Sequence, residues 1–166
     1  ILVQRNNLLK QIRFQNNLIE TLEAWDIQLV KYGSEVIKYR EKFIKHLGEV
    51  CQKIHNKLTG GKEKILLEYD RDVGYDSYLT ELAKKRQKDL KYSTTTVGPH
   101  RDDISFIVNG IDIRKYGSQG QQRTAALSLK LAQIQLMREV MKESPILLLD
   151  DVLSELDSNR KTYLLE

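Results

Sequence analysis

Two adjacent carboxylates, Asp150 and Asp151, follow a run of four apolar residues at 146–149. Such a run fits a strand covered on both faces, and open α/β sheets bind ligands at the carboxyl ends of their strands. Asp150 could hold the water shell of Mg²⁺, and Asp151 could polarise the water that attacks a γ-phosphate. The alternative is that both residues cap the next helix. The polar segment at 154–157 favours the functional interpretation.

A second candidate site is the turn at 117–120, which leads into a predicted helix that ends near residue 142. A glycine-containing turn at a helix start presents backbone N–H groups and the positive end of the helix dipole to an anion. Ser118 adds a hydroxyl at the N-cap position. An ordinary helix start explains the same residues, because Ser118 and Gln121 can form a capping box. Capping and phosphate contact are compatible, so both interpretations stay open.

The elements that position these residues are mixed strands and helices. Residues 93–97 are β-prone, Gly98-Pro99 interrupts them, and segments 104–108 and 111–113 flank Asn109-Gly110, which predicts a hairpin with a type I′ turn. The helix after the turn carries a broad apolar stripe, which predicts burial. Its members are Leu127, Leu131, Ile134 and Val140, widened by Ala125, Ala126 and Leu129.

The first half is helical in pattern, with two sets of apolar residues at steps of three and four. Gly33-Ser34 predicts the end of one helix and the N-cap of the next, and Gly60-Gly61 predicts the end of the second. With residues 1–14 these helices are predicted to pack as a hairpin or small bundle, with Trp25 in the core. A strand at 65–69 and a helix at 76–90 follow. The sets are Leu18, Leu22, Trp25 and Leu29, then Val36, Tyr39, Phe43, Leu47, Val50, Ile54 and Leu58.

Length and composition exclude several classes of protein. The 166 residues are 40% hydrophobic and 30% charged, which is typical of a folded chain. Apolar runs of four or five residues are too short to span a membrane. A single cysteine, Cys51, excludes an internal disulfide framework, and we expect a reducing, cytoplasmic location.

The charge is unevenly distributed and predicts two domains, at 1–92 and 93–166. The first carries 18 basic and 13 acidic residues, and the second carries 9 and 10. The helix at 76–90 and the residue after it carry a basic run. Its members are Lys84, Lys85, Arg86, Lys88 and Lys91. A solvated helix face is the favoured interpretation, and a DNA contact through the first four is the alternative.

Two smaller clusters have structural explanations. Cys51 and His55 lie four residues apart and could share a metal, but His46 points elsewhere and no fourth ligand is evident, so zinc is disfavoured. Asp102 and Asp103 could form an acidic site, and a charged turn before the hairpin explains them more simply.

Together these motifs resemble a known family. Residues 118–123 (Ser-Gln-Gly-Gln-Gln-Arg) resemble the signature motif of ABC-type ATPase heads of the SMC-like branch. Asp150-Asp151 resemble the Walker B carboxylates, and residues 154–157 resemble the D-loop. With residues 97–103 (Val-Gly-Pro-His-Arg-Asp-Asp), they resemble the RecF family of bacterial recombination mediators.

The resemblance implies an α/β fold: an incomplete ABC/SMC-like ATPase head lobe at 93–166 that bears a mostly helical inserted domain at 1–92. In such a head the signature motif contacts the γ-phosphate of ATP held by the opposite protomer. The implied roles are signature contacts for Ser118, Gly120, Gln121, Gln122 and Arg123, metal binding for Asp150, water activation for Asp151, and D-loop contacts for Ser154 and Asp157.

The resemblance also implies a function. The implied function is that of an ATP- and Mg²⁺-dependent DNA-binding ATPase, active in DNA repair, recombination, replication and the SOS response. ATP would drive homodimerisation on DNA at single-strand/double-strand junctions, and RecO and RecR would act with it to load RecA.

The chain departs from the wider pattern in ways that matter. Gln119 replaces the first glycine of the usual signature, and Asp151 replaces the usual Glu, so slow hydrolysis is expected. The sequence contains no P-loop and no switch histidine, and the resemblance places the P-loop before Ile1. Alone, the chain is expected to be inactive. The alternatives are a head fragment of another SMC-like ATPase, or a helical interaction module.

Overall fold

The computed structural model describes residues 1–142 and Pro145. Their contacts define two compact units, one of Ile1–Lys42 with Tyr69–Ile104 and the other of Phe43–Glu68 with the described residues from Ser105 onward. Each unit joins stretches that are distant in sequence, so this partition differs from domains at 1–92 and 93–166, which stay a prediction. Within the described part of the chain, no helix is both long and apolar enough to cross a membrane.

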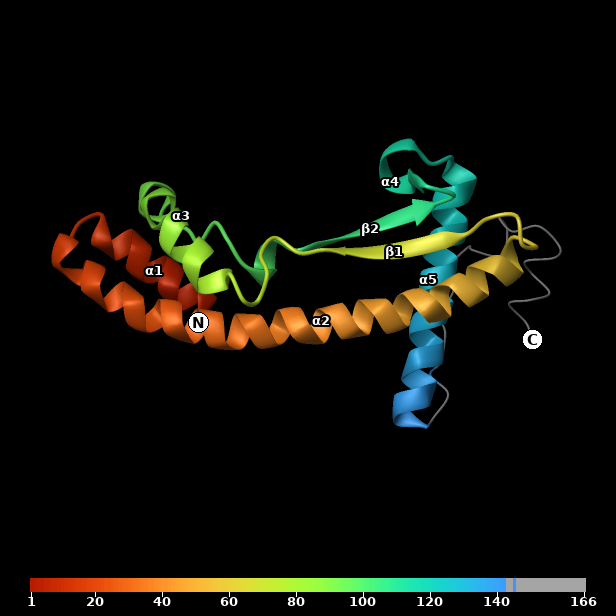
Figure 1. Cartoon of the computed structure of the whole chain (residues 1–166), viewed down its shortest axis with the longest axis horizontal. Coiled ribbons are helices and arrows are strands. Elements are labelled where there is room, and N and C mark those ends of the chain that lie inside the picture. Colours follow the sequence, from red (N-terminus) through yellow and green to blue (C-terminus); the bar gives the residue numbers. More distant parts are fainter. Residues whose placement is uncertain (143–144, 146–166) are drawn as a thin grey trace. The chain divides into compact units, whose positions relative to one another are not determined.

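The first unit is a small helical bundle. It contains α1 (Leu2–Ile12), the 3-10 helix η1 (Asn16–Thr21), the beginning of α2 (Leu22–Leu58) and α3 (Tyr78–Tyr92). Figure 1 shows α1 and α3 beside the first turns of α2. The bundle buries Leu8, Leu9, Ile12 and Leu22, with Trp25 partly buried against them. A helical bundle that includes residues 1–14 is confirmed, but α3 completes it in place of a separate helix starting at Ser34. The helix predicted at 76–90 is confirmed, shifted by two residues.

Helix α2 runs unbroken from Leu22 to Leu58 (Figure 1), so the predicted break at Gly33-Ser34 is wrong. A Cβ at Gly33 would lie 2.6 Å from Cε1 of Tyr78, which shows that this glycine permits close packing. The Ser34 hydroxyl donates to the Tyr75 carbonyl at 3.3 Å instead of capping a helix. The predicted end at Gly60-Gly61 is confirmed, because both glycines have positive φ, +60° and +77°.

The unbroken helix also changes which residues of α2 are buried. Val36, Tyr39 and Phe43 are 39%, 74% and 54% exposed, so their predicted core positions are wrong. Because α2 has no break, one continuous row of buried residues runs along it, with members seven or eight residues apart. Its members are Leu22, Leu29, Ile37, Ile44, Cys51 and Leu58.

Residues 93–97 form a loop, so a strand there is also wrong. The backbone N–H of Thr95 donates to Asn6 Oδ1 at 2.8 Å, and that of Thr96 donates to Asp89 Oδ1 at 2.9 Å. Because side chains of α1 and α3 satisfy these donors, the segment needs no strand partner.

The strands form one small sheet in the order β1-β2-β3. They are β1 (Ile65–Asp70), β2 (Asp103–Val108) and β3 (Ile111–Asp112). In the β2-β3 hairpin Val108 pairs with Ile111. The turn residues Asn109 and Gly110 both have positive φ, 49° and 82°, as a type I′ turn requires. The predicted strand at 65–69 and the predicted hairpin are confirmed.

A short helix α4 (Ile113–Tyr116) leads to α5 (Gln119–Met141). Helix α5 begins and ends where the sequence predicted. Its buried residues are Thr124, Ala125, Leu127, Ser128, Ala132 and Leu136. Val140 is 82% exposed, so the apolar stripe does not extend to the last turn of the helix. Ala126 is also exposed, so its predicted place in the buried stripe is wrong.

Candidate nucleotide-binding site

The start of α5 has the predicted capping box. The Ser118 hydroxyl accepts a hydrogen bond from the Gln121 backbone N–H at 3.2 Å. In return, Gln121 Oε1 accepts from the Ser118 backbone N–H at 3.1 Å. Two donors that a helix start leaves unpaired are therefore satisfied within the turn.

The same turn is open to an anion. Ser118, Gln119 and Gly120 are exposed, and the first turn of α5 carries no acidic residue. The hydroxyl hydrogen of Ser118 is not used by the capping bond, in which the oxygen is the acceptor. The turn therefore offers a hydroxyl donor, backbone N–H groups and the positive end of a helix dipole, which suits a phosphate oxygen.

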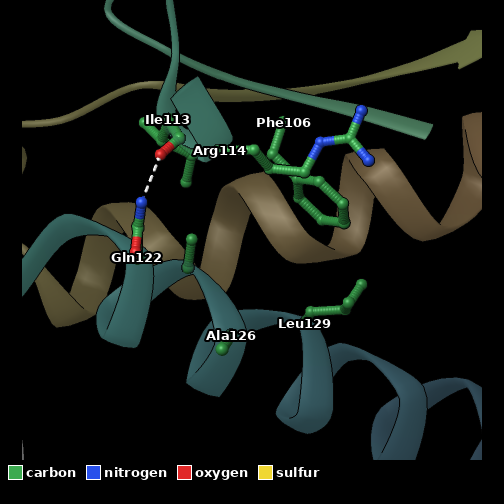
Figure 2. Close-up of a pocket in the computed structure, with 7 residues that line it drawn as sticks. Phe106, Ile113, Arg114, Gln122, Ala126 and Leu129 are labelled. Atoms are coloured by element: carbon green, nitrogen blue, oxygen red, sulfur yellow. Dashed lines mark hydrogen bonds between the residues drawn. The ribbon is translucent and has the colours of Figure 1, made fainter. Parts of the chain in front are cut away.

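The Gln122 side chain turns away from this loop. Its Nε2 donates to the Ile113 carbonyl at 2.8 Å, as Figure 2 shows. The bond crosses one side of a pocket of about 350 Å³ beside α5. The lining is largely apolar and includes Phe106, Ala126 and Leu129, with Arg114 at its edge. Gln122 therefore holds α4 against α5, and a phosphate contact by its side chain would require it to leave Ile113. Arg123 is exposed on the same turn.

Glu63 approaches residues 118–121, here called the signature loop, a contact that the sequence did not suggest. Its Oε1 accepts from Gln121 Nε2 at 3.1 Å, and its Oε2 lies 3.2 Å from Nε2 of the buried His55. Glu63 and Gln121 are 58 positions apart in the sequence, which explains why no local pattern marked the pair. His55 contacts Glu63 and Ser128, and the described residues contain no cluster that could bind a metal.

The carboxylate of Asp102 is buried at the centre of a polar cluster. It accepts from Arg40 Nη1 at 3.1 Å, from the Asp72 backbone N–H at 3.0 Å and from the Tyr69 hydroxyl. Burial and the hydrogen bond to Asp102 raise the pKa of Tyr69 to about 12. These bonds support the structural interpretation of Asp102 over an acidic site.

The predicted DNA-contact residues differ in their surroundings. Lys84 Nζ lies 2.7 Å from Glu81 Oε1, and Arg86 Nη2 lies 2.8 Å from Asp26 Oδ2. Lys85 and Lys88 are exposed. Arg86 therefore contributes to the bundle. Lys84 is exposed too, but its Nζ is paired with Glu81, so Lys85 and Lys88 are the residues of 84–88 best placed for a phosphate.

Four predicted site residues, Asp150, Asp151, Ser154 and Asp157, lie outside the described residues. Their roles, and the Mg²⁺ assigned to Asp150, stay predictions.

The fold and the loop define an α/β segment of an ABC/SMC-like ATPase head with a mostly helical domain. No family model matches the chain. It is 56% identical over 164 residues to the DNA replication and repair protein RecF of Agathobacter rectalis, and 54% identical over 166 residues to RecF of Lachnoclostridium phytofermentans. These matches cover 99% and 100% of this chain but only 45% and 46% of the two relatives.

A solved structure agrees with these relatives. The structure of the recombination mediator protein RecF with ATP, from the RecFOR pathway, matches 99% of this chain with a TM-score of 0.89 and 40% identity. The match spans 46% of that chain. The resemblance to RecF is therefore confirmed over nearly the whole sequence, and the chain spans less than half the length of these relatives.

Proposed function

We propose that this chain supplies the signature half of a composite ATP site in a RecF-type ATPase. The observation that carries the proposal is the exposed capping box at Ser118, whose free hydroxyl hydrogen and helix N-terminus suit a γ-phosphate. Ser118, Gly120 and Gln121 contact ATP held by the P-loop of the opposite protomer, so ATP drives homodimerisation. Gln122 and Arg123 complete the motif. A similar solved structure named for RecF with ATP supports the choice of nucleotide.

The remaining chemistry falls to residues after α5. Asp150 holds Mg²⁺ through water, Asp151 orients the attacking water, and Ser154 and Asp157 form the D-loop. Hydrolysis is slow because aspartate at 151 reaches less far than the usual glutamate. The chain alone does not hydrolyse ATP, since it contains no P-loop.

The biological role follows from the relatives, which are named for DNA replication and repair. The protein binds DNA in the cytoplasm at single-strand/double-strand junctions, in recombinational repair, replication restart and the SOS response. It acts with RecO and RecR to load RecA, which the RecFOR pathway of the similar structure supports.

Ser118→Asp tests the proposal in the full-length protein. Aspartate caps helices as well as serine does, so the fold and the melting temperature are retained. Its carboxylate would repel the γ-phosphate, so ATP-driven dimerisation is lost, while ATP still binds at the P-loop. Light scattering with and without ATP measures the dimer. Ser118→Thr, which keeps the hydroxyl, is the control and dimerises. Normal dimerisation of Ser118→Asp rejects the proposal.

A further inference from the structure

The side-chain amide of Gln121 is held at both ends. Its oxygen accepts from the Ser118 backbone N–H at 3.1 Å, and its nitrogen donates to Glu63 Oε1 at 3.1 Å. An amide so bound has one orientation, because a flip would place its nitrogen against the Ser118 N–H and its oxygen against the carboxylate. The capping box of the signature loop therefore depends on Glu63, a residue between α2 and β1.

Glu63 is in turn held by a buried histidine. Its Oε2 lies 3.2 Å from Nε2 of His55, which is fully buried near the end of α2, while the Glu63 side chain is 21% exposed. One carboxylate thus accepts from Gln121 with one oxygen and bonds His55 with the other. Because each oxygen has its own partner, the two bonds together fix the orientation of the Glu63 carboxylate.

The chain of bonds returns to α5. Nδ1 of His55 lies 2.9 Å from the Ser128 hydroxyl, and that hydroxyl donates to the Thr124 carbonyl at 2.7 Å. Thr124 donates to the Gly120 carbonyl at 2.7 Å. This series of hydrogen bonds therefore starts and ends at the signature loop. It passes through two side chains outside α5, those of Glu63 and His55.

We infer that Glu63 and His55 are positioning residues for the signature loop. Through the Gln121 amide they hold the Ser118 turn in the shape that meets a nucleotide on the opposite protomer. The inference rests on the proposed function. It adds two residues outside the motif, which act through Gln121 and do not touch the nucleotide.

The test is Glu63→Ala in the full-length protein, with Glu68→Ala as the matched control. Glu68 is an exposed carboxylate on β1, so the control removes the same charge. The measured quantity is the ATP concentration for half-maximal dimerisation at 25 °C. We expect about a tenfold rise for Glu63→Ala, since bonds to a charged acceptor are worth that much, and no change for Glu68→Ala.

Glu63→Gln separates positioning from general stabilisation. The glutamine oxygen can accept from Gln121, and its amide can donate to a His55 tautomer protonated at Nδ1, so every bond is kept. We expect Glu63→Gln within about twofold of the unaltered protein, because the hydrogen bonds are retained. A merely structural role would lower the melting temperature of Glu63→Ala and leave its ATP dependence unchanged.

Ser128→Ala is a second variant, for the case that Glu63→Ala does not fold. The substitution removes the Ser128 hydroxyl without adding bulk, so both its bond to His55 and its donation to the Thr124 carbonyl are lost. We expect a rise of about threefold, because Ser128 acts on the signature loop only through His55 and Glu63. If the variants of Glu63 and Ser128 dimerise like Glu68→Ala while Ser118→Asp is blocked, the positioning inference is overturned and the proposed function survives. If Ser118→Asp also dimerises normally, both fail.

Discussion

Gly33 of α2 lies directly against the ring of Tyr78 at the start of α3. A Cβ at Gly33 would stand 2.6 Å from Tyr78 Cε1, and one at Gly98 would clash with the Tyr78 hydroxyl oxygen. The Tyr78 side chain is fully buried, so its ring has no room to move aside. Two glycines that are distant in sequence thus make the space for one aromatic ring.

Alanine substitutions on α2 are expected to have opposite effects at two glycines. Gly33→Ala forces the helix away from Tyr78 and should lower the free energy of unfolding by about 1–3 kcal/mol. A Cβ at Gly48 would meet Leu67 Cβ at 3.5 Å and the Leu67 carbonyl oxygen at 3.9 Å, which are ordinary contacts. Gly48→Ala should raise stability by about 0.5–1 kcal/mol through helix propensity. Urea unfolding measures both, and a stabilising Gly33→Ala would contradict the packing.

Arg5→Met should be among the most damaging substitutions in the first unit. The fully buried guanidinium donates to Asp26 Oδ1 at 2.7 Å and to Asp89 Oδ2 at 2.8 Å. Its loss leaves two buried carboxylates without this cation, at a cost of about 3–5 kcal/mol in urea unfolding. The triple variant with Asp26→Asn and Asp89→Asn should recover part of that loss. Equal losses in both variants would show that the charges do not matter.

Cys51 should resist thiol reagents until the protein unfolds. The thiol is fully buried, and burial raises its pKa to about 12. The unfolded thiol has a pKa of about 8.5, so this group's contribution to stability is present below that pH and is lost as the pH rises toward 12. Maleimide labelling at pH 8, measured against urea, should follow unfolding. A Cys51→Ser/Lys53→Cys variant, with an exposed site on the same helix, should label at once.

Within the basic run of α3, Lys85 and Lys88 should contact DNA. Lys85→Gln with Lys88→Gln should weaken DNA binding by the full-length protein and reduce the salt slope by about 2, since each phosphate contact contributes about 0.9. The exposed Lys42 and Lys45 of α2, changed to Gln in the same way, control for net charge. Equal slopes in the two double variants would identify the run as a solvated helix face.

Local signals explain what could be predicted. Asn109-Gly110 permits positive φ at two successive residues, and Ser118 with Gln121 satisfies the first donors of α5 within four residues. The turn and the capping box each depend only on residues that are close together in the sequence. The sequence alone therefore determined the hairpin, the start of α5 and the loop of the candidate site.

Only the tertiary structure decided features that depend on distant partners. Gly33 reads locally as a helix end, yet the ring of Tyr78, 45 residues later, makes it a contact point within one long helix. The threonines near 95 are β-prone, yet Asn6 and Asp89 take their backbone donors. Glu63 has no local signature, because its role arises from His55 and Gln121 on two different helices. Propensity describes a residue's own backbone, whereas packing and hydrogen bonding depend on which residues the fold brings together.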